Sequence, residues 1–122
     1  MKLSGTVVHG KGQGRLYGMP TANLRPFDGE ALPAEGVWAV EVLLDGRTYR
    51  GLTNVGPRPT VDDNPAPTVE TMLLDFDEEI YGKTLTITFL ERIRPIMRFS
   101  GLDALRRQIS LDIEKLEKLE EI

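Results

Sequence analysis

GVWAVEVLL, residues 36–44, is followed by Asp45-Gly46 and then by RTYRGLTNV, residues 47–55. The first segment is rich in β-branched and aromatic side chains, which favour strands. Asp-Gly between two such segments is typical of a two-residue hairpin turn. Residues 36–55 therefore predict a β-hairpin.

On either side of this hairpin the sequence predicts further strands joined by irregular segments. Residues 3–9 have strand composition, and residues 83–93 alternate apolar side chains with threonine. Residues 68–75 also alternate, so that one face carries a carboxylate in line with two large apolar side chains. Residues 24–35 contain proline and glycine breakers and predict irregular structure, and the proline-rich residues 56–67 predict an extended loop.

A single helix is expected near the end of the chain. Ser100 and Asp103 have the form of an N-cap and its reciprocal partner. Residues 114–122 are rich in charge and are expected to fray. Because the strands come first and the helix last, the order favours an antiparallel barrel with a helix packed against it and excludes a parallel βαβ sheet. The apolar stripe of the helix is Leu102, Leu105, Ile109, Ile113 and Leu116.

Length and composition fit one soluble globular domain. The chain has 122 residues, no cysteine and no apolar run of membrane-spanning length. Its formal net charge of −4 argues against sequence-independent binding to nucleic acid, which requires a basic surface. We therefore expect no nucleic-acid partner, no membrane partner and a cytoplasmic location.

Residues 10–23 read GKGQGRLYGMPTAN and carry the clearest signal for a ligand. Glycines let the backbone approach phosphate closely, and Lys11 and Arg15 add positive charge. Thr21 and Asn23, just after Pro20, offer oxygen ligands for a hard cation. The segment matches neither a Walker A loop nor the dinucleotide fingerprint. The alternative is a Gly-rich hairpin end followed by a turn that Thr21 and Asn23 cap.

Charge is unevenly distributed along the chain. Residues 1–27 contain four cations and no carboxylate, and the first acid is Asp28. A local positive field of this kind favours a small polyanion such as a nucleotide over a long polymer. Chance clustering of four residues would give the same pattern.

Glu70 is the candidate catalytic acid or base. Its predicted face also carries Met72 and Leu74, and apolar surroundings raise the proton affinity of a carboxylate. The alternative is one end of a cross-strand ion pair. Several other chemically suggestive residues are interpreted as structural or solvated: His9, the aromatic residues Trp38, Tyr49 and Phe89, and the acids Asp62, Asp63, Asp75 and Asp77.

Ordered blocks over nearly the whole chain carry a family resemblance. PTAN, residues 20–23, is very specific in combination with the distant Glu70. Together the blocks resemble the riboflavin kinase family, which is also found as the C-terminal module of bacterial bifunctional FAD synthetases. The remaining blocks are GTVVHG at 5–10, Gly14-Arg15, GVWAV at 36–40, NVG at 54–56, RPT at 58–60, LDFD at 74–77, YGK at 81–83, IRP at 93–95 and Phe99.

The resemblance implies a six-stranded antiparallel Greek-key β-barrel with a C-terminal helix, formed by residues 1–122 as a single riboflavin kinase domain. It implies transfer of the γ-phosphoryl group of ATP to the 5′-hydroxyl of riboflavin, giving FMN and ADP with Mg²⁺ assistance. The expected partners are these small molecules, and the expected state is a monomer. No adenylyltransferase motif is recognisable, so conversion of FMN to FAD is not expected. Whether the chain is a natural one-activity enzyme or an excised domain stays open.

The family's functional positions fall on residues of this chain. The resemblance implies that Glu70 is the base and that Thr21 and Asn23 are associated with Mg²⁺. It implies nucleotide binding by the first Gly-rich segment and flavin binding by residues near the last strand. Met19 and Met72 depart from the Phe or His that relatives often carry. The implied nucleotide residues are Gly10, Lys11, Gly12, Gly14, Arg15 and Thr21, and the implied flavin residues are Tyr81, Arg94, Met97, Phe99 and Leu102.

A second hypothesis keeps the same barrel without catalysis, as a silent flavin- or nucleotide-binding module used for regulation. The joint presence of Thr21, Asn23 and Glu70 favours the enzyme, because a pure binder needs no base. Residues 10–18 and 95–101 are the natural candidates for lids over a substrate.

Overall fold

Six strands and one helix follow one another in the computed structural model, which describes residues 1–8, 21–56, 68–76 and 78–119. The order along the chain is strands first and helix last, as the sequence predicts. The elements are β1 (Lys2–Val8), β2 (Ala22–Pro26), β3 (Gly36–Leu44), β4 (Arg47–Gly56), β5 (Thr68–Leu73), β6 (Thr84–Arg94) and α1 (Leu102–Leu119).

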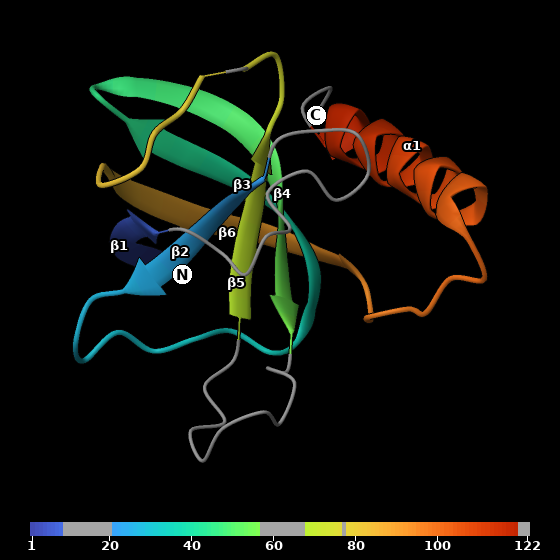
Figure 1. Cartoon of the computed structure of the whole chain (residues 1–122), viewed down its shortest axis with the longest axis horizontal. Helices are drawn as coiled ribbons and strands as arrows, with labels where there is room; N and C mark the ends of the chain where they lie inside the picture. The colour runs from blue at the N-terminus through green and yellow to red at the C-terminus, as the bar shows by residue number, and fades with distance from the viewer. Residues whose placement is uncertain (9–20, 57–67, 77, 120–122) are drawn as a thin grey trace.

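The strands close into an antiparallel barrel in the order β1-β2-β5-β4-β3-β6, with β6 returning to β1 (Figure 1). Strands β3, β4 and β5 form consecutive antiparallel neighbours, and β2 lies beside β5, which is a Greek-key connection. The predicted hairpin is confirmed, with Leu44 opposite Arg47. Asp45 and Gly46 both have positive φ, 50° and 79°, as a two-residue turn matching the strand twist requires.

Alternation along the strands sends one set of side chains into the barrel. On β5 the inward residues are Val69, Thr71 and Leu73. The hydroxyls of Thr53 and Thr71 lie 2.9 Å apart inside, so these two buried polar groups satisfy each other. The predicted core position of Phe89 is confirmed, and Trp38 contacts it edge to face with ring centroids 5.5 Å apart.

A second apolar cluster lies between the outer face of the barrel and α1, which Figure 1 shows beside the barrel. Met72 of β5 belongs to it, and Leu74 packs against it, which confirms the face predicted for residues 68–75. The helix is not of the kind that could span a membrane, and it is the one helix in the described part of the chain. The buried members of the cluster are Val37, Ala39, Leu52, Met72, Ile109 and Leu116.

Two expectations from the sequence were wrong in detail. Residues 24–26 were predicted to be irregular but belong to β2, where Leu24 lies opposite Val7 of β1. Pro26 can end this strand because pairing with its neighbours, rather than local propensity, decides the conformation there. The helix continues to Leu119 instead of fraying from residue 114, because Leu116 is fully buried against the barrel. Of the predicted loop 56–67, Gly56 belongs to β4 and the rest lies outside the described residues.

The close contact between β4 and β5 requires glycine at position 51. A Cβ atom there would lie 2.4 Å from the backbone oxygen of Met72. We expect Gly51→Ala to lower the free energy of unfolding by about 1–3 kcal/mol, because backbone has to shift to accept the methyl group. Urea denaturation measures this.

Gly101→Ala is the matched control, because no atom lies within 4 Å of the position its Cβ would take. Its free energy of unfolding should stay within about 0.5 kcal/mol of the wild type. Equal stability of the two variants would contradict the packing described for β4 and β5.

Candidate functional site

A row of polar residues crosses the outer face of the barrel over three strands. Glu70 of β5 lies directly opposite Asn23 of β2 on one side and Asn54 of β4 on the other. Residues directly opposite in antiparallel strands project from the same face of the sheet and are close neighbours. The fold therefore brings together the predicted carboxylate and the predicted amide, although they are far apart in the sequence.

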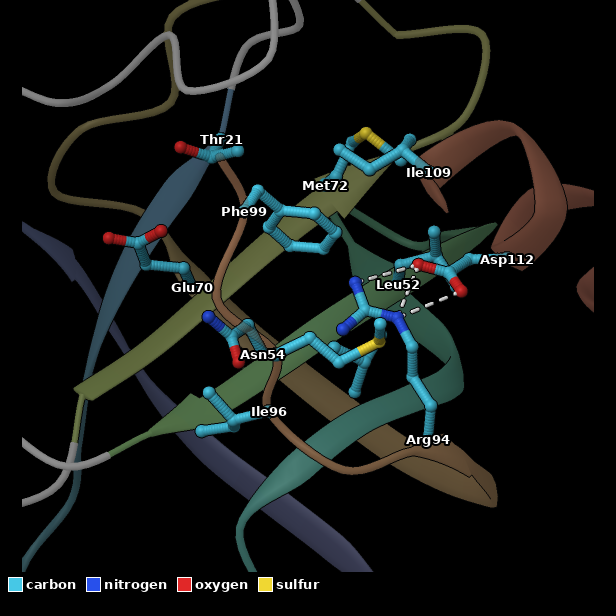
Figure 2. Close-up of a pocket in the computed structure, with 12 residues that line it drawn as sticks. Thr21, Leu52, Asn54, Glu70, Met72, Arg94, Ile96, Phe99, Ile109 and Asp112 are labelled. Atoms are coloured by element: carbon cyan, nitrogen blue, oxygen red, sulfur yellow. Dashed lines mark hydrogen bonds and ion pairs between the residues drawn. The ribbon is translucent and has the colours of Figure 1, made fainter. Parts of the chain in front are cut away.

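This row borders a pocket between the barrel, residues 95–101 and α1 (Figure 2). We call it the outer-face pocket. Its polar lining residues are Thr21, Asn54, Glu70, Arg94 and Asp112. Its apolar lining comes from Val37, Leu52 and Met72 of the sheet, Ile96, Met97 and Phe99 of the segment after β6, and Ile109 of α1.

Glu70 is set in surroundings that favour its neutral form. Partial burial removes water from the carboxylate, and this desolvation raises the pKa of Glu70. The cause is burial, and the two residues directly opposite it in the sheet are amides. The alternative interpretation, one end of a cross-strand ion pair, therefore does not involve the directly opposed residues, and it stays open for other neighbours. A carboxylate with raised proton affinity and an open pocket beside it is suited to accept a proton from a ligand.

Thr21 offers a buried oxygen at the edge of the same pocket. Its Oγ1 is shielded from solvent and has no hydrogen-bond partner among the residues that the structure describes. A buried hydroxyl left unpaired costs about 1–3 kcal/mol, so a ligand that coordinates it would recover that loss. Hydroxyl and amide oxygens are acceptable ligands for Mg²⁺, which takes the rest of its shell from water and phosphate. Thr21, with Asn23 two residues on, thus fits the cation that the resemblance implies.

The described residues contain no carboxylate-rich metal site. Within those ranges, no group of three or more His, Cys, Asp or Glu side chains is arranged to hold an ion. Asp62, Asp63 and Asp77 lie outside those ranges. A cation at the outer-face pocket would accordingly depend on few protein oxygens.

Arg94 and Asp112 form a buried ion pair on the pocket wall. Arg94 Nε donates to both carboxylate oxygens of Asp112 at 3.0 Å, and Nη2 lies 3.0 Å from Oδ2. The side chains are 11% and 1% exposed, so water screens the pair poorly. The Arg94 guanidinium carbon also lies 5.7 Å from the ring centroid of Phe99. Two predicted flavin residues are therefore neighbours at the pocket.

The other site residues predicted from the sequence fall into four groups. Met97 lines the outer-face pocket and is 43% exposed. Tyr81 and Leu102 are exposed and are not among the residues that line it, so their role stays a prediction. Asn23 lies beside Glu70 in the sheet without lining the pocket. The predicted nucleotide residues Gly10, Lys11, Gly12, Gly14 and Arg15 lie outside the described residues.

Seven residues that line the pocket were not assigned to the site from the sequence: Val37, Leu52, Asn54, Met72, Ile96, Ile109 and Asp112. A signal existed for two of them. Asn54 lies in the second strand of the hairpin, and its pairing with β5 would have placed it beside Glu70. Asp112 sits at the spacing of the apolar helix stripe, three residues after Ile109 and four before Leu116.

The pKa of Glu70 predicts how stability depends on pH. Burial raises the pKa in the folded state above that in the unfolded chain, so the unfolded chain ionises first. Stability is therefore lost as pH rises from about 4.3, the ordinary value for glutamate, through the raised folded pKa. Glu70→Gln lacks this titration. The melting temperature of the variant should therefore rise relative to that of the wild type as pH increases through that window.

Glu41→Gln is the control for this measurement, because Glu41 is an exposed carboxylate on β3. It removes the same charge from an exposed position, so it shows the effect of that loss without the burial. If the difference in melting temperature between Glu70→Gln and the wild type does not change with pH, burial does not raise the pKa of Glu70.

Comparisons with known proteins agree with this architecture. A family model described as "Flavokinase: Riboflavin kinase" matches residues 1–120. The bifunctional riboflavin kinase/FMN adenylyltransferase of Listeria monocytogenes is 38% identical over 88% of this chain and 34% of its own length. The chain thus spans about a third of that curated relative.

Two solved structures share the fold. A macrolide-efflux protein from Streptococcus pneumoniae gives a TM-score of 0.88 and 37% identity over 95% of this chain and 38% of its own. Riboflavin kinase from Trypanosoma brucei gives a TM-score of 0.64 and 24% identity over 98% of this chain and 76% of its own. The family match covers nearly the whole chain and includes every element of the barrel and the helix. The chain therefore belongs to the riboflavin kinase family.

Proposed function

We propose that this chain phosphorylates the ribityl 5′-hydroxyl of riboflavin with ATP, giving FMN and ADP. The observation that carries the proposal is the placement of Glu70 between Asn23 and Asn54, at the edge of a pocket with an apolar wall. Family membership supports the same activity. The cytoplasmic location, the monomeric state and the lack of nucleic-acid partners expected from the sequence stay predictions.

Glu70 acts as the general base in this proposal. A primary alcohol is a weak nucleophile until its proton leaves, and a carboxylate within hydrogen-bond reach accepts that proton as the new bond forms. The hydroxyl oxygen bonds to the γ-phosphorus, the bond from that phosphorus to the β,γ-bridging oxygen breaks, and ADP leaves with the bonding electrons. The proton then passes from Glu70 to solvent. The raised pKa of Glu70 matches this role, because a stronger base takes the proton more readily.

Thr21 and Asn23 hold the cation in this proposal. When bound, Mg²⁺ would neutralise charge on the phosphate oxygens and fix their geometry. Thr21 contributes a buried oxygen with no hydrogen-bond partner. Because Glu70 is the direct neighbour of Asn23, the base and the cation side of the site come from paired strands. Phosphoryl transfer depends mainly on such positioning and on electrostatic stabilisation.

The apolar wall of the outer-face pocket suits the flavin ring system. Ile96, Met97 and Phe99 face a sheet surface that includes Leu52 and Met72. A planar aromatic ligand is retained mainly by burial of apolar area, with a few polar groups fixing its orientation. The flavin would thus lie between the barrel and the segment after β6, with its ribityl chain directed toward Glu70.

The silent binding module is the rival function. The outer-face pocket by itself would serve either function, but a half-buried carboxylate with raised proton affinity favours the enzyme, because a pure binder needs no base. Incubation of the protein with riboflavin, ATP and Mg²⁺, followed by separation of flavins, distinguishes the two. FMN formation supports the kinase, and riboflavin binding without FMN supports the module.

Glu70→Gln is expected to lower kcat by about 100- to 10,000-fold, the usual contribution of a general base. The dissociation constant for riboflavin should change little, because the amide keeps the size of the carboxylate. Steady-state kinetics and quenching of flavin fluorescence measure the two quantities. Glu41→Gln on the exposed side of β3 should keep wild-type kcat, and wild-type turnover by Glu70→Gln would remove Glu70 from its role.

Thr21→Val keeps nearly the same side-chain volume and removes the buried Oγ1. We expect the Mg²⁺ concentration needed for half-maximal activity to rise, because one oxygen ligand is lost. Stability in the absence of metal should be unchanged or higher, since the deleted hydroxyl has no partner. Titration of Mg²⁺ at fixed ATP tests the first expectation, and an unchanged Mg²⁺ requirement would count against Thr21 as a ligand.

A further inference from the structure

Helix α1 is attached to the barrel through only a few buried residues. Of its 18 residues the buried ones are Ile109, Asp112 and Leu116. Ile109 and Leu116 pack into the apolar cluster on the outer face of the barrel. Asp112 is fully buried between them and carries a charge, which is costly in such a place unless a partner compensates it.

The compensation comes from three donor nitrogens, which make four contacts with the carboxylate. Arg94 Nε reaches both oxygens of Asp112 and Arg94 Nη2 reaches Oδ2, each at 3.0 Å. Gln108, one turn earlier on α1, donates its Nε2 to Oδ1 at 3.1 Å. Two donors of one guanidinium on one carboxylate fix the plane of the arginine as well as its position.

The fixed guanidinium in turn contacts the segment that follows β6. Arg94 Nη1 donates to the backbone oxygen of Pro95 at 3.3 Å. The guanidinium carbon lies 5.7 Å from the centroid of Phe99, within the range of a cation–π contact. Figure 2 shows Arg94 joined to Asp112, with Phe99 drawn at the same pocket. A chain of contacts therefore runs from α1 through Arg94 to the apolar wall.

We propose that Asp112 is a positioning residue for the flavin subsite, acting through Arg94. It sets Arg94 and thereby holds Pro95 and Phe99 against the outer-face pocket, so that docking of α1 and binding of riboflavin are coupled. The inference rests on the proposed function for the identity of the ligand. Coupling of this kind is reciprocal: whatever α1 docking adds to riboflavin affinity, riboflavin adds to the docking of α1.

A role confined to stability would look different. Loss of a purely structural clamp lowers the melting temperature and affects both substrates alike, or neither. A positioning role acts on one substrate. In Figure 2, Arg94 and Asp112 lie on one side of the pocket and Thr21 and Glu70 on the other, with Phe99 between them. Loss of the pair should therefore raise the KM for riboflavin and leave the KM for ATP unchanged.

The experiment compares Asp112→Asn with Glu114→Gln, which removes the same charge from an exposed position on the same helix. We expect Asp112→Asn to raise the dissociation constant and the KM for riboflavin about tenfold or more, within the usual range of coupling. The KM for ATP should stay within about twofold of the wild type, and so should all constants of Glu114→Gln. Fluorescence quenching gives the dissociation constant without any turnover.

Arg94→Lys is the second variant, and it decides the matter if Asp112→Asn fails to fold. It keeps a positive charge beside Asp112 but loses the planar fork and the stacking on Phe99. It should fold and show the same selective loss of riboflavin affinity. Hydrogen exchange supplies an independent readout: riboflavin should slow exchange of α1 amides in the wild type and much less in Arg94→Lys.

Specific outcomes overturn the proposal. One is unchanged riboflavin affinity in a folded Asp112→Asn or Arg94→Lys protein, and another is an equal loss of affinity for both substrates. Absence of any riboflavin effect on α1 exchange in the wild type is a third. If the wild type binds riboflavin with these couplings but forms no FMN, the proposed kinase fails while the role of Asp112 stands. If the wild type binds no riboflavin, both fail.

Discussion

The structure depends on the pairing of β5 with two strands at once. β5 joins β2 on one side and β4 on the other, and these contacts close one side of the barrel. The same pairing sets Glu70 between Asn23 and Asn54, because one register serves both the ladder and the polar row. A slip of one residue would turn Glu70 into the barrel and send Thr71 outward. The chemistry of the site is thus fixed by the condition that closes the sheet.

Much of the fold could be predicted from local sequence because its signals are local. The Asp45-Gly46 turn and the alternation of residues 68–75 each depend on neighbours a few positions away, and both are confirmed. The conformation of residues 24–26 depends instead on β1, which lies on the far side of residues 9–20 in the sequence. In the prediction, Pro26 counted against a strand at residues 24–26, and no periodicity in the sequence reveals their pairing with β1. Strand β2 was missed for this reason.

The site divides in the same way. Thr21, Glu70, Arg94, Met97 and Phe99 were predicted from the resemblance, and the structure places them at one pocket. Asn54 lies in one of the blocks that carry the resemblance but was given no role there, and Asp112 lies in none of them. The relevance of both comes from what faces them across a strand pair or a helix contact. Asp112 interrupts an apolar stripe, and a single acid at such a spacing is ordinarily read as the edge of the stripe. The reason for an acid at position 112 is the ion pair with Arg94, which lies at the end of β6.

The hydroxyl pair of Thr53 and Thr71 has a consequence for engineering this domain. These residues face inward from the same two strands that present Asn54 and Glu70 outward, and they satisfy each other without help from the site. Inner and outer faces of β4 and β5 therefore have separate packing partners, the barrel interior on one side and α1 on the other. Residues on the outer face can therefore be substituted to change which ligand binds. The contacts inside the barrel would stay the same in such variants.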